Sequence, residues 1–156
     1  MLAEHIASQI YENFAFEPTP AQKNAIERLG GFLCGDAQDR IFILNGYAGT
    51  GKTSLIAALV KTLSGLRVRT ILLAPTGRAA KVMSRYAGAK AYTIHKKIYR
   101  QKSLASEDAS FSLDYNKEKG AVFIVDEASM LSNYSSDGSI FGSGQLLEDL
   151  IAYIRK

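Results

Sequence analysis

The chain has little cysteine, and its apolar residues never gather into one long run. Its one cysteine, Cys34, excludes an internal disulfide and fits a reducing cytoplasm. We read Cys34 as a small buried residue near a helix end. No apolar run reaches the roughly 18 residues that a membrane-spanning helix needs, and residues 1–10 lack the apolar centre of a signal peptide. We therefore expect a cytoplasmic protein with no membrane partner, of a length that suits one domain.

Acidic residues are missing from a long central stretch. No Asp or Glu stands between Arg40 and Ser106, although 13 of the 19 Lys and Arg residues do. The net charge of +4 is mild, but its distribution along the chain is strongly uneven. Such segregation suits a polyanion, either a nucleotide or a nucleic acid. A solvated basic face that binds nothing is the open alternative.

Two helices are expected at the start of the chain. Apolar residues recur every four positions over residues 2–14, which is the spacing of a helical stripe. Residues 19–22 (TPAQ) have the form of a helix start, with Thr19 as N-cap, a proline in the first turn and Gln22 at the capping-box position.

Short apolar runs then alternate with helical patterns. Buried strands are expected over residues 40–45, 68–74 and 121–125. Helices are expected over residues 52–63 and 76–86, from the cap Thr93, and around 146–154. Residues 101–120 are polar and predict a loop or a short hairpin around Phe111 and Leu113, and 132–143 predict a flexible loop. This alternation predicts an α/β fold with a parallel sheet flanked by helices.

A glycine-rich loop lies between the first expected strand and the helix after it. Residues 46–53 (GYAGTGKT) match the P-loop pattern G-x-x-x-x-G-K-[ST]. Its glycines let backbone N–H groups surround phosphate oxygens, and the following helix directs its positive end at them. We expect Lys52 to reach the β- and γ-phosphates and the Thr53 hydroxyl to bind Mg²⁺. The predicted ATP-binding residues of the loop are Gly46, Ala48, Gly49, Thr50, Gly51, Lys52 and Thr53.

Two carboxylates, Asp126 and Glu127, follow the third expected strand. Asp126 is expected to hold the Mg²⁺, directly or through water. Glu127 is expected to orient and deprotonate the water that attacks the γ-phosphate. The predicted catalytic residues are therefore Lys52, Asp126 and Glu127. The alternative is an exposed acidic pair that caps a helix at Ala128.

Several segments, in order along the chain, resemble the RecD-type branch of superfamily-one DNA helicases, the branch of the exodeoxyribonuclease V alpha subunit. They are Pro20-Ala21-Gln22, GYAGTGKT at 46–53, APTGRAA at 74–80, Thr93-Ile94-His95 and DEASM at 126–130. The resemblance implies a RecA-like P-loop NTPase fold with ATP and Mg²⁺ as cofactors. It implies an enzyme that couples ATP hydrolysis to 5′ to 3′ movement on single-stranded DNA, in repair or recombination, with helicase–nuclease partner subunits.

The resemblance also assigns roles to single residues. It makes Gln22 the reader of adenine and places Thr76, Gly77, Arg78 and His95 along the path of single-stranded DNA. Each residue has an ordinary alternative: Gln22 as the capping partner of Thr19, Thr76 and Arg78 as a plain helix start, and His95 as a helix residue. For Tyr92 and Tyr99, stacking on bases competes with packing in the core.

By the same resemblance, a further strand and a second motor lobe would follow the last helix, and neither follows Lys156. We expect N-terminal helices over residues 1–38 and a partial motor domain over 39–156, incomplete at its C-terminus. The absent strand belongs between the strand before the P-loop and the strand before Asp126. We therefore expect negligible ATP hydrolysis by this chain alone, and self-association through unpaired strand edges.

Two other functions remain open from the sequence. One is another P-loop enzyme, such as a nucleotide kinase or an AAA+ type ATPase, although no arginine-rich lid follows residue 106. The other is a module that binds nucleotide or DNA without catalysis, which the presence of Lys52, Asp126 and Glu127 argues against. DNA-stimulated ATP hydrolysis would separate the helicase from both.

Overall fold

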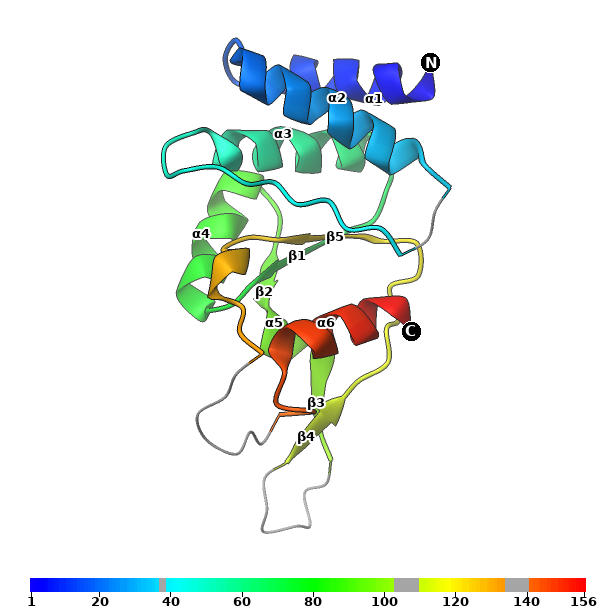
Figure 1. Ribbon diagram of the computed structural model, residues 1–156, viewed down its shortest axis with the longest axis vertical. Coiled ribbons are helices and arrows are strands. Elements are labelled where there is room, and N and C mark those ends of the chain that lie inside the picture. The colour runs from blue at the N-terminus through cyan, green and yellow to red at the C-terminus, as the bar shows by residue number, and fades with distance from the viewer. Residues whose placement is uncertain (37–38, 103–109, 134–140) are drawn as a thin grey trace. The chain divides into compact units, whose positions relative to one another are not determined.

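The structure, a computed structural model, describes residues 1–36, 39–102, 110–133 and 141–156 (Figure 1). The chain forms two compact units. The first comprises Met1–Val68 with Tyr86–Gly88, and the second comprises Arg69–Arg85 with Ala89–Lys156. The boundary that we predicted between residues 38 and 39 stays a prediction.

Helices make up the regular structure of the first unit: α1 (Leu2–Glu12), α2 (Pro20–Cys34) and α3 (Lys52–Gly65). The capping box at the start of α2 is confirmed, since the Gln22 N–H donates to the Thr19 hydroxyl at 3.2 Å and the Thr19 N–H donates to Gln22 Oε1 at 2.8 Å. At the C-terminal end of α1, Asn13 Nδ2 donates to the Thr62 hydroxyl on α3 at 3.0 Å. The buried apolar residues of this unit include Ile6, Ile10, Ile26, Leu29, Leu55, Leu59 and Leu63.

Residues 40–45 do not form a buried strand, so that prediction is wrong. Ile41 is 63% exposed and Ile43 is 82% exposed. Within the described parts of the chain, no strand pairs with this segment, and a strand is stable only when a neighbour satisfies its N–H and C=O groups. The segment is instead attached to α2, where the Phe42 ring packs edge-on against Phe32 and Arg40 donates to the Phe32 carbonyl at 2.9 Å.

The second unit is built on a parallel three-stranded sheet in the order β2-β1-β5, which confirms the predicted α/β class. The strands are β1 (Thr70–Ala74), β2 (Ala91–Thr93) and β5 (Val122–Val125). In the register, Ala74 stands opposite Thr93, and Leu73 stands opposite Val125. The carboxyl ends of the three strands therefore meet at one edge of the sheet.

Helices and a hairpin accompany this sheet: α4 (Gly77–Ala87), α5 (Ile94–Ile98), α6 (Leu146–Arg155), and the antiparallel strands β3 (Tyr99–Gln101) and β4 (Phe111–Leu113). The predicted hairpin around Phe111 and Leu113 is thus confirmed, whereas most of the predicted loop 132–143 lies outside the described residues. In Figure 1, α5 and α6 lie together near the sheet. Their apolar residues join one core with β1, formed by Ile71, Leu73, Ile94, Ile98, Tyr99, Leu150 and Tyr153. Of the helices described, none combines the length and the apolar character needed to cross a bilayer.

A buried carboxylate anchors α6. Asp149 is 7% exposed, and its Oδ2 accepts hydrogen bonds from the Tyr99 hydroxyl at 2.6 Å and from the Ser143 N–H at 3.0 Å. Its Oδ1 accepts from the Ser143 hydroxyl at 2.7 Å. These bonds join α6, β3 and the turn before α6 into one polar network, which offsets the cost of burying the charge. Tyr99 is therefore a core residue, as the packing alternative held.

Candidate nucleotide and nucleic-acid site

The P-loop occupies the turn that leads into α3, in the first unit. Gly49 and Gly51 have φ of 79° and 84°, the left-handed region in which a side chain is strained. A Cβ at Gly51 would collide with the Gln22 side-chain amide, whereas a Cβ at Gly49 would meet nothing within 4 Å. The loop backbone is thus open to solvent at Gly49 and tightly packed at Gly51.

Lys52 is the first residue of α3, and its side chain folds back over the loop. Its ammonium donates to the carbonyl oxygens of Gly46 and of Tyr47, the latter at 3.1 Å. The Thr50 hydroxyl donates to the same Tyr47 carbonyl at 2.7 Å. An ammonium has three donors, and two of those of Lys52 bond the loop carbonyls. The phosphate contact predicted for Lys52 stays a prediction. Thr53, the next residue of the helix, is exposed.

Gln22 links the start of α2 to the P-loop. Its Oε1 serves the capping box, and its Nε2 donates to the Thr50 carbonyl at 3.1 Å. The capping role that we held as an alternative is confirmed, and the adenine-reading role stays a prediction. A hollow in the same unit is lined by residues around the connection from α1 to α2: Tyr11, Phe14, Phe16, Glu17, Pro18 and Lys23.

In the second unit, three of the predicted motifs follow three neighbouring strands. Thr76 comes two residues after β1, His95 comes two residues after β2, and Asp126 comes directly after β5. Because the strands are parallel and in register, these residues gather at the edge where open α/β sheets bind ligands. The family resemblance indicated the motifs after β1 and β2, and the acidic pair was indicated by its place after an expected strand. The sheet order places the APTGRAA motif between the other two.

Thr76 and Thr93 cap the helices that leave this edge, as predicted. The Thr76 hydroxyl oxygen accepts from the Ala79 N–H at 3.1 Å, and the Thr93 hydroxyl oxygen accepts from the Lys96 N–H at 3.2 Å. Gly77 and Arg78 begin α4 and are both exposed.

His95 is half-buried against two aromatic rings, with ring centroids 4.8 Å from Phe141 and 5.7 Å from Tyr99. This burial lowers the pKa of His95 below its ordinary value of 6.5. Near pH 7 the imidazole is therefore mostly neutral, and the DNA contact predicted for His95 stays a prediction.

Asp126 and Glu127 turn sharply away from β5. The Asp126 N–H donates to the Leu73 carbonyl at 3.0 Å, which extends the β1–β5 ladder by one residue, and Asp126 Oδ1 accepts from the Glu127 N–H at 2.9 Å. Glu127 has φ 55° and ψ 36°, a left-handed conformation that costs a residue with a side chain about 1–3 kcal/mol. Its side chain makes no capping bond to the short helix Ala128–Met130. Glu127 therefore occupies the N-cap position of this helix, as the capping alternative had it, but without a side-chain bond, and its catalytic role stays a prediction.

The predicted metal-binding residues, Thr53 and Asp126, carry oxygen groups of the type that Mg²⁺ prefers. In the part of the chain that the structure describes, no three His, Cys, Asp or Glu side chains gather into a metal site of their own. Mg²⁺ commonly takes one or two protein groups and completes its shell with phosphate oxygens and water. The exposed hydroxyl of Thr53 in the first unit and the half-buried carboxylate of Asp126 in the second are each a group of that kind, and their shared role at one Mg²⁺ stays a prediction.

One residue of the core network escaped the sequence analysis. Asp149 occupies the same helical stripe as Leu146, Leu150 and Tyr153, at spacings of three and four residues. An acidic residue on the apolar stripe of a helix indicates a buried, hydrogen-bonded carboxylate, so this spacing could have identified Asp149 from the sequence.

Comparison with known proteins gives a consistent family. A family model described as an AAA domain matches residues 18–138. The chain is 30% identical over 140 residues, or 85% of its length, to the multifunctional conjugation protein TraI of Escherichia coli. It is 30% identical over 74% of its length to the ATP-dependent RecD2 DNA helicase of Deinococcus radiodurans, and 37% identical over 56% of its length to the ATP-dependent DNA helicase dda of Enterobacteria phage T4. The aligned part is 7%, 16% and 20% of these three relatives, respectively.

Proposed function

The chain belongs to the AAA domain family, in the RecD-type branch of superfamily-one helicases, and from this premise we propose that it is an ATP-hydrolysing motor module that acts on single-stranded DNA. The observation that supports this most directly is the P-loop, in which Lys52 is held over an open, glycine-rich backbone at the start of α3.

Nucleotide binding would use the first unit. The N–H groups of Gly49 to Lys52 and the third donor of Lys52 would take the phosphates, at the positive end of α3. Gln22 would read the adenine, and the neighbouring hollow, with the rings of Phe14 and Phe16, offers an apolar wall for a planar base. Because Gln22 also bonds the Thr50 carbonyl, it would report the presence of a base to the phosphate loop.

Hydrolysis would use Asp126 and Glu127. Asp126 with Thr53 would hold Mg²⁺, whose chemistry when bound is to neutralise charge on the phosphate oxygens. Glu127 would accept the proton of the attacking water, a role that its exposed carboxylate beside Asp126 supports.

The DNA strand would run past the carboxyl edge of the sheet, over Thr76, Gly77, Arg78 and His95. We propose that cycles of ATP binding and hydrolysis move the strand 5′ to 3′, in repair or recombination, and that helicase–nuclease subunits are partners. Self-association of the chain is part of the proposal, and the segment 40–45 supports it, because Ile41 and Ile43 are exposed and no strand among the described residues pairs with the segment.

The test is a pair of variants compared with the wild type. Lys52→Ala removes a charged phosphate contact, so a fluorescent ATP analogue with Mg²⁺ should bind more weakly by roughly 1.5–3 kcal/mol. Glu127→Gln should bind the analogue as the wild type does, while hydrolysis stimulated by single-stranded DNA falls by roughly 10²–10⁴. Equal affinity in the wild type and Lys52→Ala would refute the nucleotide site. Full hydrolysis by Glu127→Gln would refute the general base.

A further inference from the structure

Helix α4 is fixed in its rotation about its own axis. Ala80 is 6% exposed and Met83 is 0% exposed, so this side of the helix faces the core. The Ser84 hydroxyl donates to the Ala80 carbonyl at 3.0 Å and accepts from the Ala91 N–H at 2.8 Å, which attaches the helix to the first residue of β2. The opposite side of α4 is therefore held toward solvent.

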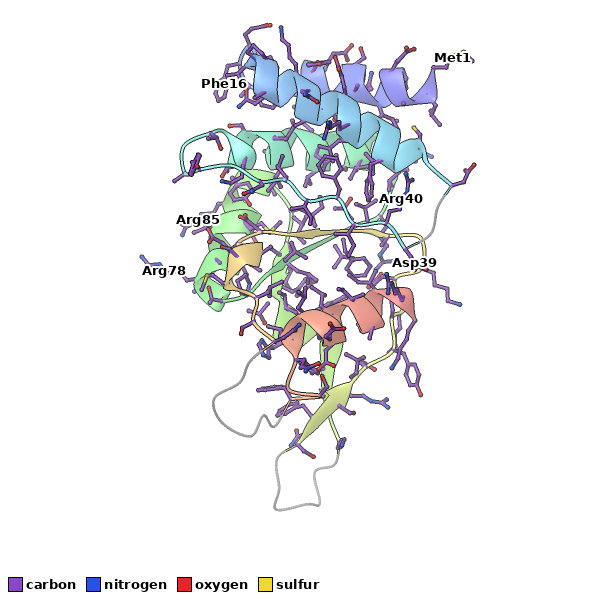
Figure 2. All side chains as sticks on the ribbon, in the orientation of Figure 1. Met1, Phe16, Asp39, Arg40, Arg78 and Arg85 are labelled. Atoms are coloured by element: carbon purple, nitrogen blue, oxygen red, sulfur yellow. The ribbon has the colours of Figure 1, made fainter. Side chains whose placement is uncertain are left out.

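That outer side carries a row of basic residues, which we name the α4 track: Arg78, Lys81 and Arg85, with Val82 among them. Their spacings of three, four and seven residues place them on one helical face, about 10.5 Å long at 1.5 Å per residue. All are exposed, Val82 by 52%. Figure 2 labels Arg78 and Arg85 on the outer side of α4.

The positive charge of the α4 track is not compensated within the described residues. No carboxylate oxygen there lies within 4.0 Å of the three basic side chains. The helix contains no acid of its own, and none occurs in the sequence from Arg40 to Ser106. A ligand with regularly spaced negative charges would supply the missing partners.

Arg78 also stands against the preference of its helix. It lies in the first turn of α4, where the helix dipole is positive and acidic residues are favoured, and this turn has no acidic residue. A cation there weakens the isolated helix and strengthens its attraction for an anion. A residue that breaks a local rule in this way points to a functional constraint.

We propose that the α4 track binds the backbone phosphates of a single-stranded nucleic acid that continues from the sheet edge along the outer side of α4. The proposal rests on the proposed function, which puts a DNA strand at Thr76 and Arg78. Lys81 and Arg85 extend that binding surface by two phosphates. A protein partner fits less well, because a protein interface has an apolar core and the track offers a single exposed valine among three cations.

The test measures how the affinity for DNA depends on salt concentration. The logarithm of the binding constant falls linearly with the logarithm of the salt concentration. For a single strand, each phosphate that the protein no longer neutralises makes this negative slope shallower by about 0.7. For a 12-nucleotide oligo-dT, which reaches the track, Lys81→Ala/Arg85→Ala should therefore make this negative slope shallower by about 1.4. A 4-nucleotide oligo-dT, which covers only the sheet edge, should bind this variant and the wild type with the same slope.

Two control variants separate position from charge. Arg28→Ala/Lys61→Ala removes two exposed basic residues from α2 and α3, an equal reduction of net charge, and should keep the wild-type slope. Lys81→Arg/Arg85→Lys keeps the charges of the track and should also keep the slope. Circular dichroism establishes that all variants have the same helix content.

The outcomes are distinct. An unchanged slope for Lys81→Ala/Arg85→Ala on the longer oligonucleotide overturns the track but leaves the DNA function standing. Absence of salt-dependent DNA binding by the wild type refutes the DNA function, and the track with it. A third outcome concerns polyglutamate. If the wild type binds polyglutamate as tightly as the oligonucleotide, and Lys81→Ala/Arg85→Ala weakens both to the same extent, the track binds an acidic protein and the nucleic-acid assignment is wrong.

Discussion

Replacing Gln22 by Glu separates the two hydrogen bonds that this side chain makes. Gln22 Oε1 accepts from the Thr19 N–H at 2.8 Å, and Nε2 donates to the Thr50 carbonyl at 3.1 Å. Glutamate keeps an acceptor for Thr19, and Glu is as suitable as Gln in a capping box. Its second oxygen, however, would face the Thr50 carbonyl with no proton to donate. The substitution should therefore spare α2 and disturb the P-loop.

The size of the effect follows from these two bonds. Loss of one neutral hydrogen bond costs about 0.5–1.5 kcal/mol. A carboxylate placed beside a loop that receives phosphates adds a repulsion of about 1 kcal/mol in a solvated setting. Together these amount to about 1.5–2.5 kcal/mol, so affinity for Mg-ATP should fall roughly tenfold to seventyfold.

Gln22→Ala provides the contrast, because it removes both hydrogen bonds and introduces no charge. Its free energy of unfolding without nucleotide should fall by about 1–2 kcal/mol, more than that of Gln22→Glu. Its affinity for nucleotide should fall less than that of Gln22→Glu. Urea unfolding measures the first quantity, and titration with a fluorescent ATP analogue measures the second. If Gln22→Glu binds the analogue as tightly as the wild type, the bond to Thr50 does not shape the loop and the reasoning fails.

Two further substitutions test the second unit. Tyr99→Phe removes a buried hydrogen bond to the Asp149 carboxylate and should lower the free energy of unfolding by about 1.5–3 kcal/mol. The control Tyr92→Phe, on half-buried β2, should change it by no more than about 0.5 kcal/mol. Equal effects of the two substitutions would show that the Asp149 bond contributes little. Burial lowers the pKa of His95, so as the pH falls the imidazole is protonated in the unfolded chain before it is protonated in the folded one. The contribution of His95 to the free energy of unfolding is therefore full above pH 6.5 and declines as the pH falls below that value. His95→Gln should flatten the decline in thermal unfolding measured from pH 7.5 to 5, and an unchanged profile would assign it to other groups.

The sequence predicted the elements whose signals are local. Thr19, Thr76 and Thr93 each cap a helix through a bond to a residue three positions on, so their spacing was sufficient. The P-loop and the pair Asp126–Glu127 were likewise indicated by short, contiguous sequence patterns. The prediction of a strand over residues 40–45 was wrong because a strand needs a neighbouring strand to pair with, and the local sequence does not show whether one is present. Its apolar composition is that of a buried strand, yet Ile43 is 82% exposed.

Properties that depend on distant residues were also out of reach. The left-handed backbone of Glu127 is unusual for a residue with a side chain, and nothing in DEASM indicates it. The network of Asp149, Tyr99 and Ser143 joins residues up to 50 positions apart. Spacing hinted at Asp149 alone, and only the packed structure supplies its partners.

The shared edge of β2, β1 and β5 has a consequence for how such a protein tolerates change. An inserted or deleted residue within a strand would reverse the face of every later side chain and shift the motif that follows it. The strands should therefore be fixed in length over evolutionary time. The connections that lead to the amino ends of the strands, from α4 to β2 and from β4 to β5, carry none of the three motifs. Natural variants and engineered insertions should therefore concentrate there, and this end of the sheet is the natural place to attach a tag or an additional module.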